Sequence, residues 1–163
     1  MLVYHGTNKE FERFDNGFMD SNELSQELGS GFYFTKKEDI ARQYGDVILK
    51  CEISDGPYIL RYESEEVGED LVERMIKLSP NVNDALSDFG EVGYEGYATV
   101  FSRAVEAYVG YRLDQFVNAL SCDFYKNEPV LFNKNFKELT GYVGVVDCFN
   151  YLVFLAEDIR IVG

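Results

Sequence analysis

Two short segments near the N-terminus place the strongest constraint on the fold. Residues 4–7 read YHGT and residues 29–35 read GSGFYFT. The first segment ends a short apolar run and predicts a strand over residues 1–5, with His5, the only histidine of the chain, at its end. The second predicts a glycine-rich turn and a strand over residues 31–35. We expect these strands to border one cleft that the side chains of His5 and Tyr33 both reach.

The rest of the chain mixes strand and helix patterns, with strands at both ends and helices between them. This order predicts an α+β fold with a largely antiparallel sheet. Residues 8–30 form a polar, glycine-containing loop, and a loop of this length is either functional or disordered. The other predicted strands span 46–53, 58–62, 142–146, 149–155 and 159–162, and the predicted helices span 37–44, 65–78 and 98–120, the last with a break at Gly110.

Composition narrows the class of partner. The chain has 163 residues, enough for one domain with a real core, and a net charge of −14. Such a charge repels nucleic acid and anionic membrane, and it favours a protein target with a basic surface. The alternative is that the charge only keeps the protein soluble. Between residues 61 and 95 there are ten acidic and three basic residues, which indicates a solvated face.

The cysteines and the apolar runs give no sign of a metal site or a membrane anchor. Three widely spaced cysteines form no CxxC pair and no Cys/His cluster, so we expect neither a metal nor a disulfide framework. No signal-peptide pattern and no run of roughly 20 apolar residues is visible. A reducing cytoplasm is the expected location.

The N-terminal motifs resemble the NAD-binding half of ADP-ribosyltransferases of the diphtheria-toxin and poly(ADP-ribose) polymerase type. In those transferases a strand ends in His-Gly, a later segment reads Gly-x-Gly-x-Tyr-Phe, and the next helix carries a small residue and then a tyrosine. Here the glycine-rich segment that starts at Gly29 aligns without gaps as far as Ala41 and Tyr44.

The chain also resembles the short transferase domains of phage and mobile-element polyvalent proteins. The resemblance covers roughly residues 1–60 and 138–163, and it implies split, mostly antiparallel sheets with peripheral helices. The length fits a single domain over 1–163, in which the acidic middle, around 62–137, carries no family motif and is expected to be a helical insertion. The segments that carry the resemblance are 4–7 (YHGT), 11–15 (FERFD), 141–144 (GYVG), 150–154 (NYLVF) and 159–161 (IRI).

The resemblance implies a site for NAD, which would be the substrate and source of ADP-ribose. His5 would bind a ribose hydroxyl, Tyr33 and Tyr44 would flank the nicotinamide ring, and the backbone of Gly6 would hold the carboxamide. Taken one at a time, each of these residues also has an ordinary structural explanation. The full set of cofactor-binding candidates is His5, Gly6, Thr7, Arg13, Gly31, Tyr33, Ala41 and Tyr44, and the catalytic candidates are His5, Tyr33 and Asn150.

Two positions depart from the family pattern. Ala41 stands where a serine often binds the carboxamide, and Asn150 stands where the catalytic glutamate is usual. An amide can bond a ribose hydroxyl but cannot accept a proton or supply full negative charge. Asp147 or Glu157 are possible substitutes. If the strand is regular, Asp147 is expected on the face opposite to Asn150.

These features lead to three alternative functions. The leading one is a cytoplasmic mono-ADP-ribosyltransferase, a bacterial or phage effector that transfers one ADP-ribose from NAD to a protein target and releases nicotinamide. The second is a catalytically inactive transferase-fold protein that binds or inhibits a partner. The third is an NAD glycohydrolase toxin, in which water replaces the protein acceptor.

Overall fold

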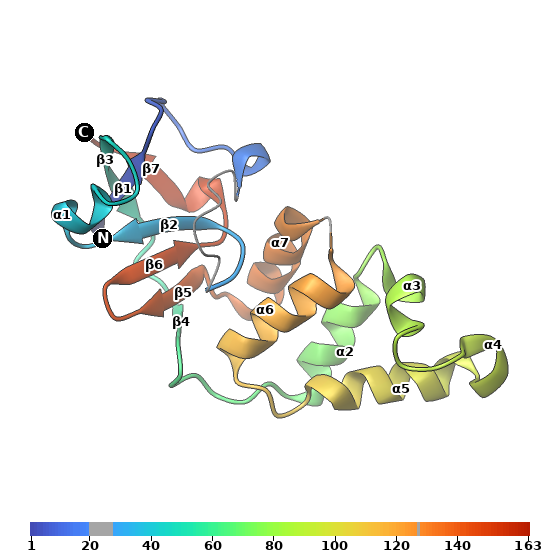
Figure 1. Cartoon of the computed structure of the whole chain (residues 1–163). Coiled ribbons are helices and arrows are strands. Elements are labelled where there is room, and N and C mark those ends of the chain that lie inside the picture. Colours follow the sequence, from blue (N-terminus) through green and yellow to red (C-terminus); the bar gives the residue numbers. More distant parts are fainter. Residues whose placement is uncertain (20–27, 127) are drawn as a thin grey trace.

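The computed structural model of the protein describes residues 1–19, 28–126 and 128–163. Strands occupy both ends of the chain and helices lie between them (Figure 1). The strands are β1 (Leu2–Thr7), β2 (Phe32–Thr35), β3 (Val47–Ile53), β4 (Tyr58–Leu60), β5 (Gly144–Asp147), β6 (Asn150–Val153) and β7 (Ile159–Ile161). The α-helices are α1 (Glu38–Ala41), α2 (Glu69–Lys77), α3 (Val82–Leu86), α4 (Val92–Glu95), α5 (Tyr97–Tyr108), α6 (Leu113–Phe124) and α7 (Pro129–Thr140), and the 3-10 helices are η1 (Asn16–Phe18) and η2 (Ala156–Asp158).

The strands of the described residues form one sheet in the order β4-β5-β6-β2-β1-β3-β7. Neighbouring strands are antiparallel except β4 and β5, so the predicted α+β class with a mostly antiparallel sheet is confirmed. β1 pairs with β3 along its whole length, from Leu2 to Thr7. With β2, however, it pairs only where Tyr4 meets Thr35. The sheet is therefore nearly split at its centre.

The alternation of side chains along the strands divides the apolar residues between two cores. On one face, the cross-strand partners Ile59, Val145 and Leu152 pack against the helices. On the other face, a second core includes Phe32 and Phe34 of β2. Because the strands β2 and β6 are buried on both faces, they read as nearly continuous apolar runs in the sequence.

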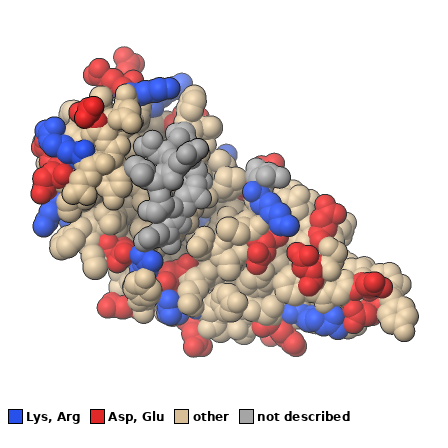
Figure 2. Space-filling model, in the orientation of Figure 1, with Lys and Arg blue, Asp and Glu red and all other residues tan. Residues whose placement is uncertain are grey.

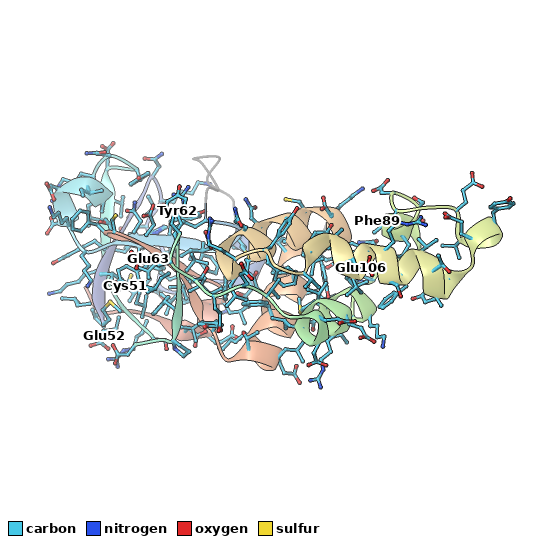
Figure 3. All side chains as sticks on the ribbon, turned by 90° about the horizontal axis from the view of Figure 1, so that it is seen from below. Cys51, Glu52, Tyr62, Glu63, Phe89 and Glu106 are labelled. Carbon is cyan, nitrogen blue, oxygen red and sulfur yellow. The ribbon has the colours of Figure 1, made fainter. Side chains whose placement is uncertain are left out.

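The helices α2 to α7 lie between β4 and β5 in the chain, in the segment where the acidic helical insertion is predicted. They gather beside the β4–β5 side of the sheet, and α4 with the start of α5 lies farthest from it (Figure 1). Figure 3 shows Tyr62 and Glu63 where the chain leaves the sheet, and Phe89 and Glu106 further along the helical part.

Some helix boundaries differ from the predicted ones. The pattern over 98–120 contains two helices, α5 and α6, and the predicted break is present at Gly110, whose φ of 90° cannot continue a helix. The first helix is shorter than predicted and ends at Ala41. Helix α7 was not predicted, although Pro129 in its first turn and the left-handed Gly141 after its end are typical boundary signals. The short helices α3 and α4 were also not predicted.

Within residues 1–19, 28–126 and 128–163, no helix is long and apolar enough to cross a bilayer. Figure 2 shows acidic side chains over both the sheet and the helices, with basic side chains among them. Several of these basic groups form ion pairs one helical turn away, such as Lys77 with Glu73.

Candidate functional site

A cavity of about 1150 Å³ opens beside the place where β1 and β2 separate, and this volume is at the upper end for ligand pockets. Residues from β1, the loop after it, β2, α1 and the β5–β6 hairpin line its wall. All nine candidate residues contribute to this wall: His5, Gly6, Thr7, Arg13, Gly31, Tyr33, Ala41, Tyr44 and Asn150. The structure thus brings together residues that are far apart in the sequence.

The separation of β1 from β2 exposes backbone groups to the cavity. Backbone N–H and C=O groups point to the same side of a strand at every second residue. Tyr4 pairs with Thr35 of β2, so Gly6 directs its groups to the same side, where the pairing has ended. In an unbroken sheet, Gly6 and Tyr33 would form the next pair. This arrangement leaves a backbone donor and acceptor at Gly6 beside a cavity that it lines.

The His5 side chain bridges the gap between the two strands. Its Nδ1 donates a hydrogen bond to the backbone oxygen of Tyr33 at 2.8 Å. A carbonyl can only accept, so the neutral ring carries its proton on Nδ1 and presents Nε2 as an acceptor. Burial lowers the pKa of His5 below its usual 6.5, and the bond to Tyr33 opposes that shift only in part. His5 is therefore a neutral acceptor on the cavity wall.

Aromatic side chains fix the orientation of the His5 ring. Phe14 packs edge-on at 5.1 Å between ring centroids, and Phe34 lies at 5.5 Å. Phe14 comes from the FERFD segment, whose Asp15 accepts a hydrogen bond from Gly17 and begins the short helix η1. The FERFD segment thus anchors the loop after β1 against the wall of the cavity.

Tyr33 lines the same cavity but leaves the sheet on the other face. Its cross-strand partner Leu152 belongs to the helical core, whereas His5 faces the core that contains Phe34. Both side chains reach one cavity because β1 and β2 part beyond their single pair. The hydroxyl of Tyr33 donates to Gly29 O at 2.8 Å and accepts from Leu28 N at 3.2 Å.

Two glycines are required by close packing. A Cβ on Gly6 would lie 1.9 Å from the carbonyl oxygen of Ala41, so the glycine lets α1 approach β1. This approach places Ala41 and Tyr44 on the cavity wall, where Tyr44 is 40% exposed. A Cβ on Gly31 would lie 2.5 Å from the carbonyl oxygen of Val153, so the turn before β2 packs tightly on β6.

Five polar side chains form a row across the sheet. Tyr4, Thr35, Asn150 and Asp147 are successive cross-strand partners on β1, β2, β6 and β5. Arg61 extends the row, because it follows β4 and its N–H donates to Val146 O beside Asp147. Every member lines the cavity.

The expected position of Asp147 is wrong. A regular strand from 147 to 150 would put Asp147 and Asn150 on opposite faces. Instead, the two residues are cross-strand partners in the β5–β6 hairpin, joined by a two-residue turn, and so they share a face. Cys148 in this turn has a φ of 48°, which reverses the chain. A single left-handed residue therefore decides which side of the sheet carries the carboxylate.

Asp147 is held in place by Arg61. The Arg61 Nη1 lies 2.8 Å from Asp147 Oδ2, and the two side chains are only 20% and 25% exposed. The Asp147 carboxylate also raises the pKa of the Cys148 thiol through a hydrogen bond. Sequence reasoning missed Arg61, because it lies at the start of a segment that was interpreted as a solvated face. Glu157 accepts a hydrogen bond from the Asn16 side chain and does not line the cavity.

A family match covers the N-terminal part of the chain, which forms most of the cavity wall. Residues 1–66 match a family described as ADP-ribosyltransferase in polyvalent proteins. The N-terminal part is therefore similar to ADP-ribosyltransferases of the polyvalent-protein type. Comparisons with curated proteins and with solved structures gave no match. The resemblance predicted from the motifs is therefore confirmed over this part of the chain.

The matched segment and the remainder contribute differently to the wall of the cavity. Residues 1–66 supply β1, β2, α1 and Arg61, and with them eight of the nine candidates. The ninth, Asn150, comes from β6 and is brought to the cavity by pairing with Thr35. ADP-ribosyltransferases use NAD as the source of ADP-ribose, and the described residues form no group of three or more His, Cys, Asp or Glu side chains placed for a metal ion.

Proposed function

We propose that the protein binds NAD in this cavity and transfers one ADP-ribose unit to a protein, with release of nicotinamide. The observation that carries the proposal is the opened pair of Gly6 and Tyr33, with a neutral His5 fixed across the gap. Gly6 offers a backbone donor and acceptor, which suit the carboxamide of nicotinamide. The Nε2 of His5 suits a ribose hydroxyl as donor.

The aromatic residues of the cavity support the same orientation of NAD. Tyr33 and Tyr44 both line it, and their rings offer surfaces for the nicotinamide. Holding a dinucleotide bent at its reacting bond supplies much of the rate, because nicotinamide is already a good leaving group. Asn150 would bond the ribose hydroxyl without acting as a base. Transfer is therefore expected to stop at one unit, since extending a chain needs a base for the incoming hydroxyl.

A direct test measures NAD binding and NAD cleavage together. NAD should raise the melting temperature of the wild type, because a ligand of the native state stabilises it. Tyr33→Ala should abolish most of that shift, and Tyr33→Phe should keep it, since the ring remains. Tyr94→Ala is the matched control, because Tyr94 is 89% exposed on α4 and lies outside the cavity wall. No shift at millimolar NAD would contradict the proposal.

Radiolabelled NAD then separates the transferase from its alternatives. A labelled protein band in a cell lysate supports transfer to a protein. Nicotinamide release without a band supports a glycohydrolase. Binding without either product supports an inactive transferase-fold module, an alternative that the neutral Asn150 favours.

The charge of the chain favours a target with a basic surface. The net charge is −14, and attraction between opposite charges weakens as salt is added. Labelling of the target should therefore fall as salt rises from low ionic strength. Nicotinamide release without a target is the control and should change little. A labelling rate that does not depend on salt would contradict this assignment.

A further inference from the structure

We propose that Asp147 supplies the negative charge that stabilises the reacting ribose. The amide of the neighbouring Asn150 carries no such charge. The inference rests on the proposed function, because it concerns the same bound NAD. It assigns a catalytic role to a residue that lies outside the matched segment and that strand periodicity alone would place on the wrong face.

The register of the hairpin puts Asp147 beside the proposed ribose position. Asp147 and Asn150 are direct cross-strand partners, and such partners on one face lie about 5 Å apart at their Cβ atoms. Both line the cavity, together with Thr35 on the next strand. A group that contacts Asn150 from inside the cavity is therefore within reach of the Asp147 carboxylate.

The ion pair with Arg61 fixes the carboxylate before the substrate arrives. Nη1 of the Arg61 guanidinium lies 2.8 Å from Oδ2 of Asp147. Both side chains are mostly buried, so the carboxylate is held with little freedom to turn. A charge held in place needs no reorganisation when the reacting centre becomes positive, which is the main source of electrostatic catalysis.

The chemistry requires a negative charge at this point and no proton acceptor. The bond between C1′ of the ribose and the pyridinium nitrogen breaks, and its electron pair leaves with neutral nicotinamide. Positive charge then develops over C1′ and the ring oxygen, and a nearby carboxylate stabilises it. An oxygen or nitrogen of the acceptor forms the new bond to C1′, and its proton passes to water. Asn150 orients the ribose hydroxyl, and Asp147 faces the developing cation.

Glu157 gives a matched control, because it is the other carboxylate considered for this role. The Asn16 side chain donates to it at 3.3 Å, and it lies outside the cavity wall. Glu157→Gln removes the same charge from the chain as Asp147→Asn removes. The double variant Asp147→Asn/Asn150→Glu moves the carboxylate across the hairpin and leaves the net charge unchanged.

The experiment measures nicotinamide release and the NAD dissociation constant for wild type and these three variants, with a melting curve for each. Asp147→Asn should lower the rate about a hundredfold while NAD still binds. Glu157→Gln should keep the wild-type rate. The double variant should recover most of the lost rate, which a purely structural ion pair would not explain.

Three results would overturn the inference. One is an Asp147→Asn variant that cleaves NAD at the wild-type rate. Another is a double variant that binds NAD but stays as slow as Asp147→Asn. The third is a wild type that binds NAD and releases no nicotinamide. The first two results leave the proposed function standing, whereas a wild type that binds NAD without releasing nicotinamide, or that does not bind NAD, would remove the proposed function and this inference with it.

Discussion

His5 performs two tasks with its two ring nitrogens. Nδ1 donates a hydrogen bond to the Tyr33 carbonyl across the gap between β1 and β2, and Nε2 remains as an acceptor. The second task needs the neutral ring, because in the cation both ring nitrogens carry protons and Nε2 could no longer accept. Burial among Phe14 and Phe34 lowers the pKa of His5 and so keeps the ring neutral near pH 7.

The lowered pKa of His5 predicts a loss of stability in acid. Because the folded chain resists protonation more than the unfolded chain, this contribution is complete above the unfolded pKa near 6.5 and is lost as the pH falls below it. His5→Asn keeps an N–H for the Tyr33 carbonyl but cannot titrate. Urea unfolding between pH 7.5 and pH 5 should therefore show a smaller loss for His5→Asn than for the wild type. Equal losses would show that His5 is not responsible.

Among the secondary-structure elements, the contact between β1 and α1 decides the shape of the cavity wall. The end of α1 passes so close to β1 that the Ala41 carbonyl occupies the space beside Gly6. The two residues are in contact although they lie 35 positions apart in the sequence. It determines where Tyr44 meets the cavity, three residues after Ala41.

Gly6→Ala should destabilise the fold by at least about 2 kcal/mol, because the added Cβ would lie 1.9 Å from a backbone oxygen that cannot rotate away. Gly68→Ala is the control, since nothing lies within 4 Å of its Cβ position, and it should change stability by less than about 0.5 kcal/mol. The free energy of unfolding in urea measures both. Similar values for the two variants would show that α1 can move away from β1 without cost.

Considered as one unit, the protein joins a sheet to a group of helices through both apolar and polar contacts. Leu152 and Phe154 belong to the helical core, and Asn133 of α7 provides the polar link. The Asn133 amide donates to Ser30 O at 2.9 Å and to Phe154 O at 3.0 Å, and the side chain is 1% exposed. Ser30 precedes Gly31, which lines the cavity, so α7 holds the turn that carries a part of the wall although no α7 residue lines it.

Asn133→Ala should cost about 2 kcal/mol of stability, because it removes the donor of the buried Phe154 carbonyl and of the partly buried Ser30 carbonyl. It should also weaken NAD binding through the loosened turn, although Asn133 does not line the cavity. Asn135→Ala, two residues along the same helix, is the control and should leave NAD binding unchanged. Titration calorimetry and urea unfolding check both effects. Unchanged NAD affinity in Asn133→Ala would show that the contact of α7 with the turn before β2 does not affect NAD binding.

Local sequence was sufficient to predict the strands and the helices α1, α2, α5 and α6, but not α3, α4 and α7. Strand alternation and turn residues identify β1, β2 and β3, because their side chains meet a buried face at every second residue. The ungapped motif from Gly29 to Tyr44 names residues that the structure then places on one cavity wall.

Only the tertiary structure decided how strands distant in the sequence pair. The single pair between Tyr4 and Thr35, and the gap beyond it, result from the strong pairing of β1 with β3 and of β2 with β6 on either side. The shared face of Asn150 and Asp147 depends on one left-handed residue, Cys148, whose conformation periodicity cannot show. A strand pattern is the same whichever partner it meets, so register, and with it the position of the carboxylate, belongs to the folded chain.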